Sequence, residues 1–256
     1  MNVKLNVYNL FLILLFLINI PVIGQFYSMG EHPSSTKWNQ INTDKFQIIF
    51  DENAEKNAQK VANILDKVYK YVGQNLEGDP AKISIILQNH TTESNGFVTL
   101  APKRSEFFTT APQDNDVIDW LGLLAIHELR HVLQMDNLNQ GITKILSILL
   151  GEQGRGLTFG LTVPLWFMEG DAVGTETALT SAGRGRLPSF EMPFRTQLLE
   201  YGPYSYQKAS FGSYKNIVPN QYPFGYFMTT YVKKHYGNKV WGNVLTRVGR
   251  NPLLPF

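Results

Sequence analysis

The pattern of apolar and polar positions divides the chain into an early part of short strands and a later part of long helices. Apolar runs of strand length, bounded by polar or turn residues, predict strands over residues 46–50, 82–87 and 96–100. Apolar residues recur at helical spacing from position 54 to about 76, which predicts an amphipathic helix between the first two strands. The polar stretch over 31–40, which contains proline and serine, is typical of a lead-in to the folded domain.

Two longer helical segments are expected after these strands, over 117–135 and 164–179. The stretch over 95–112 is expected to contain an edge strand and a hairpin turn near Pro102. The order of a strand, a helix, further strands and then helices predicts an α+β domain. Its sheet is built early in the chain and its second half is helical.

The first 24 residues have the pattern of a signal peptide. A single lysine, Lys4, precedes a short apolar run over 10–18, and small residues then lead into a polar segment. Because the run is too short to span a bilayer comfortably, we expect cleavage after Gly24, with an uncleaved membrane anchor as the alternative. Residues 25–256 are then one exported domain, secreted, periplasmic or at the cell surface, with no membrane contact after cleavage.

Composition narrows the class of protein without naming an activity. With 256 residues, 43% of them hydrophobic and 17% charged, the chain resembles folded globular proteins. A net charge of +2 is too small to indicate nucleic acid or an anionic membrane as a partner. The absence of cysteine excludes disulfides and a lipoprotein anchor. Any zinc site must therefore use histidine and carboxylate ligands.

The strongest chemical signal is the run His-Glu-Leu-Arg-His at 127–131, within the first of the two later helices. Asp116 is the expected N-cap of that helix. His127 and His131 are four residues apart, so they lie on one face and can both bind one ion. Glu128 lies about 100° round the helix from the first histidine, where it can take a proton from an attacking water molecule.

A catalytic zinc site needs a third protein ligand and an open position, and no other histidine lies in a segment that suggests a ligand. Glu169, in the second turn of the helix over 164–179, is the best candidate. Gly170 and Gly174 on that helix indicate a close approach to another element, which we expect to be the histidine helix. Asp171 or Glu176 could accept the second ring N–H of a ligand histidine, with a solvated helix face as the alternative for both.

The two segments together resemble the gluzincin metallopeptidases. The pattern is His-Glu-x-x-His followed by Trp-x-x-Glu-Gly-x-Ala-x-x-x-Glu over 166–176. It is closest to the peptidase MA-like families, which include relatives of the M1 aminopeptidases. The resemblance covers most of the mature chain and implies His127, His131 and Glu169 as zinc ligands, with Glu128 as the general base. It also implies a zincin, thermolysin-like catalytic domain with an early mixed sheet, whose edge strand receives the substrate.

The resemblance points to a further side chain that stabilises the oxyanion. Water attack on a peptide carbonyl builds negative charge on its oxygen, and a second donor usually assists zinc there. Relatives of this kind use a tyrosine in a Tyr-x-x-Gly setting that opens a helix. Tyr222 stands in such a setting, and Tyr226 is the second candidate. Because the chain has 12 tyrosines, simple packing is the alternative for both.

One departure from the M1 pattern is the long gap between His131 and Glu169. Residues 139–161 in this gap are expected to form an amphipathic helix and a glycine-rich loop that wall the cleft. Arg184 and Arg186 are expected to lie in a solvated turn, with binding of a carboxylate as the alternative.

These features predict a zinc peptidase, in which a water molecule held by zinc and activated by Glu128 attacks the carbonyl carbon of a peptide or protein substrate. The Gly-x-Met-Glu-Asn segment with which M1 aminopeptidases mark a free amino terminus is absent, so endopeptidase action is the default. The resemblance further implies that backbone over 95–97 or 105–110 binds an extended peptide by strand addition.

The rival interpretation is a catalytically silent zincin-fold module that serves a cell-surface protein by binding. Relatives of this kind can carry a C-terminal β-propeller, and the abrupt end at 251–256 is expected if a partner domain follows. A module that only binds does not need Glu128, so we favour the enzyme. A structural zinc site is disfavoured because such sites fill all four positions with protein ligands.

Overall fold

The computed structural model describes residues 32–113 and 119–253 of the protein. These residues belong to one compact unit that begins at His32. The expected signal peptide lies outside the described residues, and so does Asp116, the expected cap of the motif helix. Among the helices of the described residues, none is long and apolar enough to cross a membrane.

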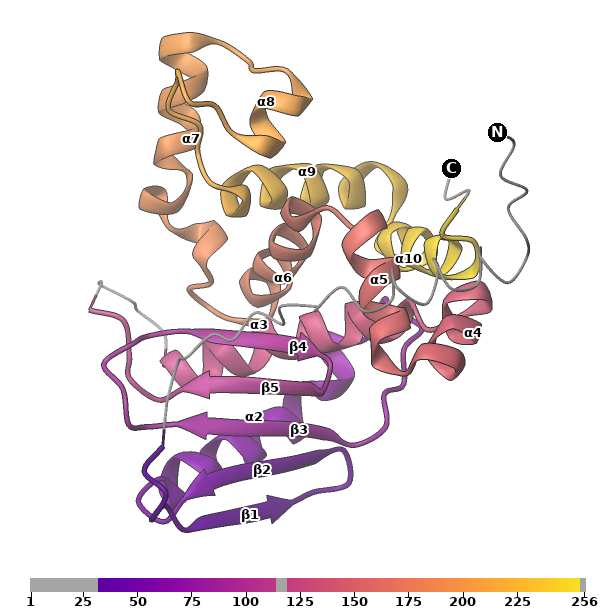
Figure 1. Ribbon diagram of the computed structural model, residues 1–256. Helices are drawn as coiled ribbons and strands as arrows, with labels where there is room; N and C mark the ends of the chain where they lie inside the picture. The colour runs from indigo at the N-terminus through magenta and orange to yellow at the C-terminus, as the bar shows by residue number, and fades with distance from the viewer. Residues whose placement is uncertain (1–31, 114–118, 254–256) are drawn as a thin grey trace, which may run out of the picture. The chain divides into compact units, whose positions relative to one another are not determined.

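The first part of the described chain forms a mixed sheet of five strands, β1 (Trp38–Asn42), β2 (Phe46–Asp51), β3 (Ile83–Gln88), β4 (Gly96–Leu100) and β5 (Lys103–Phe108). Their order across the sheet is β1-β2-β3-β5-β4 (Figure 1). The three central strands are parallel, whereas β1 and β4 are antiparallel to their neighbours. The three expected strands are confirmed as β2, β3 and β4, and the expected hairpin joins β4 to β5.

The first strand was not expected from the sequence. Residues 38–40, which are expected to belong to the lead-in, form part of β1, so the first strand begins within that stretch. Most residues of β1 are exposed, and within the sheet it pairs only with β2. Such an edge strand buries no alternating apolar face, and its sequence therefore lacks the period that would reveal it.

Two helices, α2 (Glu55–Val72) and α3 (Trp120–Asn137), pack on one face of the sheet. Phe46 and Ile48 of β2 are fully buried on this face, in one apolar core with the helices. Figure 1 shows both helices behind the strands. The predicted amphipathic helix is confirmed as α2, although it ends at Val72 and not near position 76.

The second half of the described chain is mostly helical. Its elements are α4 (Gly141–Leu150), α5 (Glu152–Thr162), α6 (Leu165–Leu179), the 3-10 helix η1 (Arg184–Arg186), α7 (Pro188–Tyr201), α8 (Tyr206–Phe211), α9 (Gln221–Tyr236) and α10 (Val240–Arg250). The protein is thus a mixed α/β fold with an early mixed sheet and a helical second half, as the order of sequence patterns predicts.

The stretch between the two site helices forms a pair of helices, so the prediction of one helix and a glycine-rich loop is wrong for the loop. Gly151, with a positive φ of 64°, separates α4 from α5. Gly154 lies within α5, where a Cβ would stand 2.3 Å from the carbonyl oxygen of Leu146. The carboxylate of Glu152 accepts a hydrogen bond of 2.7 Å from the backbone N–H of Lys103. The pair is therefore closely packed, and Glu152 ties it to the first residue of β5.

Helices α6 and α9 cross with their backbones in contact. A Cβ at Gly170 would lie 2.0 Å from the carbonyl carbon of Gly225, and a Cβ at Gly225 would lie 1.8 Å from the carbonyl oxygen of Trp166. A Cβ at Gly174 would lie 3.5 Å from the side chain of Thr230, which is also on α9. The prediction that these glycines admit the histidine helix is therefore wrong, because α9 is the helix that approaches them.

Candidate metal centre

The two histidines of the motif lie on α3, a helix that is buried on nearly every side. Its described part begins at Trp120 after an N-cap, Asp119, whose carboxylate accepts a hydrogen bond of 2.9 Å from the backbone N–H of Gly122. A helix that is largely apolar around its circumference packs inside a protein and not at its surface. The sequence of α3 therefore places His127 and His131 in the interior.

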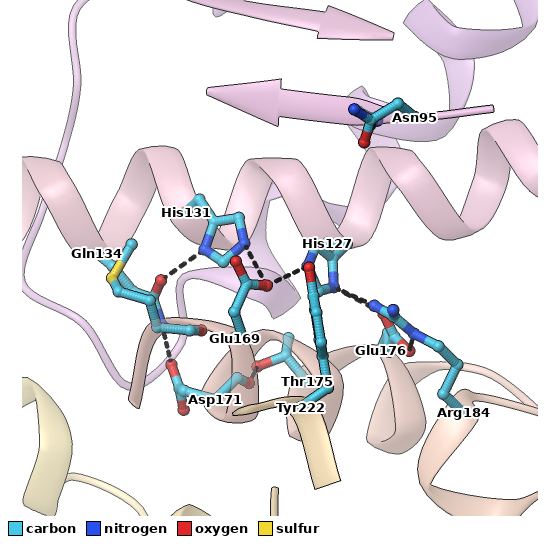
Figure 2. A network of polar contacts seen from close by, with 12 residues as sticks. Asn95, His127, His131, Gln134, Glu169, Asp171, Thr175, Glu176, Arg184 and Tyr222 are labelled. Carbon is cyan, nitrogen blue, oxygen red and sulfur yellow. Dashed lines mark hydrogen bonds and ion pairs between the residues drawn. The ribbon is translucent and has the colours of Figure 1, made fainter. Parts of the chain in front are cut away.

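His127, His131 and Glu169 of α6 each bring one ligand atom to a common place (Figure 2). The Nε2 atoms of the two histidines lie 3.2 and 3.4 Å from Oε2 of Glu169. The three ligand atoms all lie within 4.8 Å of one another. Tetrahedral ligands with bonds of about 2.1 Å stand about 3.4 Å apart. The three side chains can therefore hold one metal ion.

The other ring nitrogen of His127 is held by a carboxylate. Its Nδ1 lies 2.8 Å from Oε2 of Glu176. The guanidinium of Arg184 in η1 binds both oxygens of that carboxylate, at 2.6 and 2.9 Å, and its Nη2 also lies 2.8 Å from Nδ1. An anionic acceptor favours the tautomer of the neutral ring that carries its proton on Nδ1, so that Nε2 is the nitrogen able to bind a metal. Arg184 thus binds a carboxylate, which corrects the prediction of a solvated turn.

The second histidine is held through an amide. Nδ1 of His131 donates to Oε1 of Gln134 at 3.0 Å, and Nε2 of Gln134 donates to Oδ2 of Asp171 at 2.7 Å. Asp171 is fully buried between Arg130, at 2.6 Å, and Lys233, at 2.5 Å. Of the two acids expected to support a histidine, Glu176 does so directly and Asp171 does so only through Gln134.

Electrostatic interactions keep the carboxylates of Glu169 and Glu176 charged. Burial would raise the pKa of Glu169, yet interactions with His131 and His127 lower it well below its ordinary value. Burial likewise opposes, but does not prevent, the lowering of the pKa of Glu176 to about 2 by Arg184 and His127. Burial and Arg184 lower the pKa of His127, but hydrogen bonds with the two glutamates outweigh them and raise it to about 9. The ligand carboxylate is therefore anionic at neutral pH and suited to bind a cation.

Glu128, the expected general base, is only 4% exposed, and burial raises the pKa of its carboxyl group. It lies beneath Gly96, the first residue of β4, where a Cβ would stand 2.9 Å from Oε1 of Glu128 and 2.5 Å from the side chain of Leu124. Since β4 is an edge strand, the glycine lets an edge of the sheet pass close to the base. β5 pairs on both sides, so the expectation that backbone over 105–110 accepts a new strand is wrong.

Tyr222 lies near the ligand group, as expected. It is the second residue of α9, and its ring centroid lies 6.4 Å from that of His127. The guanidinium carbon of Arg184 lies 5.2 Å from the centre of the tyrosine ring. Burial and the nearby Glu169 raise the pKa of Tyr222 to about 12, so the hydroxyl keeps its proton and can donate. Figure 2 shows the ring rising from α9 towards the histidines.

Tyr226, the second tyrosine candidate, packs elsewhere. A Cβ at Gly185 would lie 2.4 Å from its ring, and the ring of Phe190 stands 6.0 Å from it. This side chain therefore packs against η1 and α7, as the alternative interpretation of the tyrosines expects.

Comparison of the sequence with models of known protein families and with curated proteins gives no match. The resemblance to gluzincins therefore depends on the residues of the two motif segments. Function has to be argued from what these side chains can do together.

Proposed function

We propose that the protein is a zinc peptidase of the gluzincin type, built on a thermolysin-like zincin fold and exported from the cell. One observation carries the proposal: two histidine Nε2 atoms and one carboxylate oxygen meet at 3.2 and 3.4 Å, with a buried glutamate beside them on the same helix. Two imidazoles and one carboxylate, in a chain without cysteine, form the donor set of a catalytic zinc site.

Each side chain then has a separate task. His127, His131 and Glu169 would hold the zinc ion, which supplies Lewis acidity towards the substrate carbonyl when it is bound. Glu128 takes a proton from the attacking water molecule and returns it to the leaving amine. Burial strengthens this carboxylate as a base, because burial disfavours its charged form. Tyr222 donates a hydrogen bond to the carbonyl oxygen as negative charge develops on it.

The substrate is an extended peptide. β4 presents an edge of the sheet, and a peptide that adds to such an edge forms main-chain hydrogen bonds with it. Gly96 brings this strand to within contact distance of Glu128. A bound peptide bond would thus lie near the base, and endopeptidase action is proposed because the aminopeptidase segment is absent.

The proposal is tested with purified full-length chain, its Glu128→Gln variant and the matched control Glu200→Gln, whose carboxylate is exposed on α7. Zinc content is measured first, and cleavage is then followed in peptide mixtures with free and with acetylated amino termini. We expect one zinc per chain in all three proteins, and a loss of turnover of about 10²- to 10⁴-fold in Glu128→Gln alone.

Cleavage of the acetylated peptides supports endopeptidase action, whereas cleavage of free peptides alone contradicts it. Bound zinc with no turnover in any of the three proteins overturns the peptidase and leaves a zincin-fold binding module. The absence of bound zinc overturns the metal assignment itself.

A further inference from the structure

A pocket of about 620 Å³ lies away from the candidate metal ligands, and none of those ligands lines it. Its walls come from the end of α2, from α3, from α6 and from the last turns of α9. No step of the proposed peptidase chemistry uses this pocket.

The pocket wall is strongly basic. Four cationic side chains line it, Arg130, Lys233, Lys234 and Lys239, and no aspartate or glutamate is among the described residues of the wall. Asp171 lies behind the wall and is already paired with two of the cations. Within the described part of the chain, the side chains of Lys234 and Lys239 form no ion pair. The wall therefore carries an excess of positive charge that only a bound anion or solvent ions can balance.

Arg130 offers a specific hydrogen-bond donor to such an anion. Its side chain is 1% exposed, its Nε binds Asp171, and its Nη1 donates to the carbonyl oxygen of Val72 and to Oδ1 of Asn75. Its Nη2 is buried and has no hydrogen-bond partner among the described residues. A buried donor without a partner is costly, and a guanidinium that has donors to spare binds oxyanions well.

We propose that this pocket is a binding site for a small organic phosphate. The phosphate group would accept hydrogen bonds from Nη2 of Arg130 and from the amino groups of Lys234 and Lys239. A single carboxylate would leave most of the positive charge of the wall unbalanced, whereas a phosphate carries nearly two charges and three acceptor oxygens. The volume exceeds that of the phosphate group, and the apolar residues Ala178 and Leu179 line the rest of the wall.

The cations could serve a different purpose, which the test must separate. α2, α6 and α9 all end near the pocket, and cations offset the partial negative charge at helix C-termini. If the lysines act only on the helix C-termini, their replacement should lower the stability of the protein, and the pocket should bind no anion.

The test is calorimetric titration of zinc-loaded, full-length protein with phenyl phosphate, and with benzoate as the carboxylate probe of similar size. Lys234→Gln/Lys239→Gln is compared with Lys56→Gln/Lys67→Gln, a control pair of exposed lysines on α2. Both variants keep the same metal ligands, so any binding of the probe to zinc is equal in all samples.

We expect saturable binding of phenyl phosphate to wild type and to Lys56→Gln/Lys67→Gln. Its affinity for Lys234→Gln/Lys239→Gln should be weaker by about 10-fold or more. Benzoate should bind much more weakly than phenyl phosphate. The absence of binding to wild type, an equal loss in both variants, or equal affinity for the two probes would each overturn the proposal. Because binding is measured directly, a failure of the peptidase proposal leaves this result unchanged.

Discussion

Replacing Gly170 by alanine should separate the two helices that carry Glu169 and Tyr222. The new Cβ would lie 2.0 Å from the carbonyl carbon and 2.3 Å from the carbonyl oxygen of Gly225. Carbon atoms in contact prefer a separation of about 3.5 to 4 Å. Since the obstructing atoms belong to the backbone of α9, no side-chain rotation relieves the clash. The helices must move apart by more than about 1 Å.

The magnitude follows from two opposing effects. Overpacking of a well-packed interior costs about 1–3 kcal/mol, and we take the upper end because both partners are backbone. Alanine is the better helix former by about 1 kcal/mol, which offsets part of that cost. The net loss in the free energy of unfolding is then about 2 kcal/mol. For a domain of this size, it lowers the melting temperature by about 4–8 °C.

The assay is thermal unfolding followed by circular dichroism, with Gly160→Ala as the matched control. Gly160 lies in α5, and a Cβ built there meets nothing within 4 Å. Its replacement should therefore stabilise the protein by about 0.5–1 kcal/mol. If Gly170→Ala melts at or above the temperature of wild type, the contact between α6 and α9 is not as close as described, and the reasoning fails.

Three further predictions concern the site itself. Glu176→Gln removes the anionic partner of His127, and the affinity for zinc, measured by competition with a chelator, should fall by about 10- to 100-fold. Gly96→Ala places a methyl group 2.9 Å from Oε1 of Glu128, so turnover should fall by about 10-fold or more while zinc content stays unchanged. Asp171→Asn removes the carboxylate from a buried ion set, and the free energy of unfolding, measured with urea, should fall by about 3–5 kcal/mol.

Matched controls separate these effects from general damage. Glu200→Gln and Asp44→Asn make the same chemical changes at exposed positions, and each should leave zinc affinity and stability close to those of wild type. Unchanged zinc affinity in the variant of Glu176 would show that the carboxylate does not support the histidine. If Gly96→Ala lost zinc, the substitution would act through the candidate zinc ligands and not through Glu128.

Apolar periodicity made most of the sheet readable from the sequence, because β2, β3 and the helix α2 each bury one regular face. The sequence does not predict β1, because an exposed edge strand shows no such apolar pattern. The glycines over 151–156 predict a loop, although Gly154 is a helical residue whose missing side chain lets α4 and α5 come into contact. Glycine marks a loop and a close helix contact equally well, and only the partner helix decides between them.

Two of the candidate metal ligands, His127 and His131, can be predicted from the sequence because they share one helix and obey its period. Their supports are predicted only in part: the place of Glu176 and Asp171 on the second helix suggests both, whereas the other supports lack such a signal. Gln134 lies three positions after His131, a spacing that places both on one helix face and could have suggested the contact. For Arg184, the sequence offers carboxylate binding only as the alternative to a solvated turn. Lys233 comes from a distant element, and nothing in the sequence singles it out among the 23 lysines and arginines of the chain.

The buried ion set around Asp171 has a consequence for the order in which the protein folds. The negative charge of Asp171 is neutralised by Arg130 from α3 and by Lys233 from α9. The carboxylate can therefore be buried at low cost only after both helices have docked. Gln134, which positions His131, binds the same carboxylate. The second histidine thus gains its support in the step that closes α9 over α6. A chain emerging from the ribosome would already contain the candidate ligand residues, but these residues would come together as a candidate metal centre only near the end of folding.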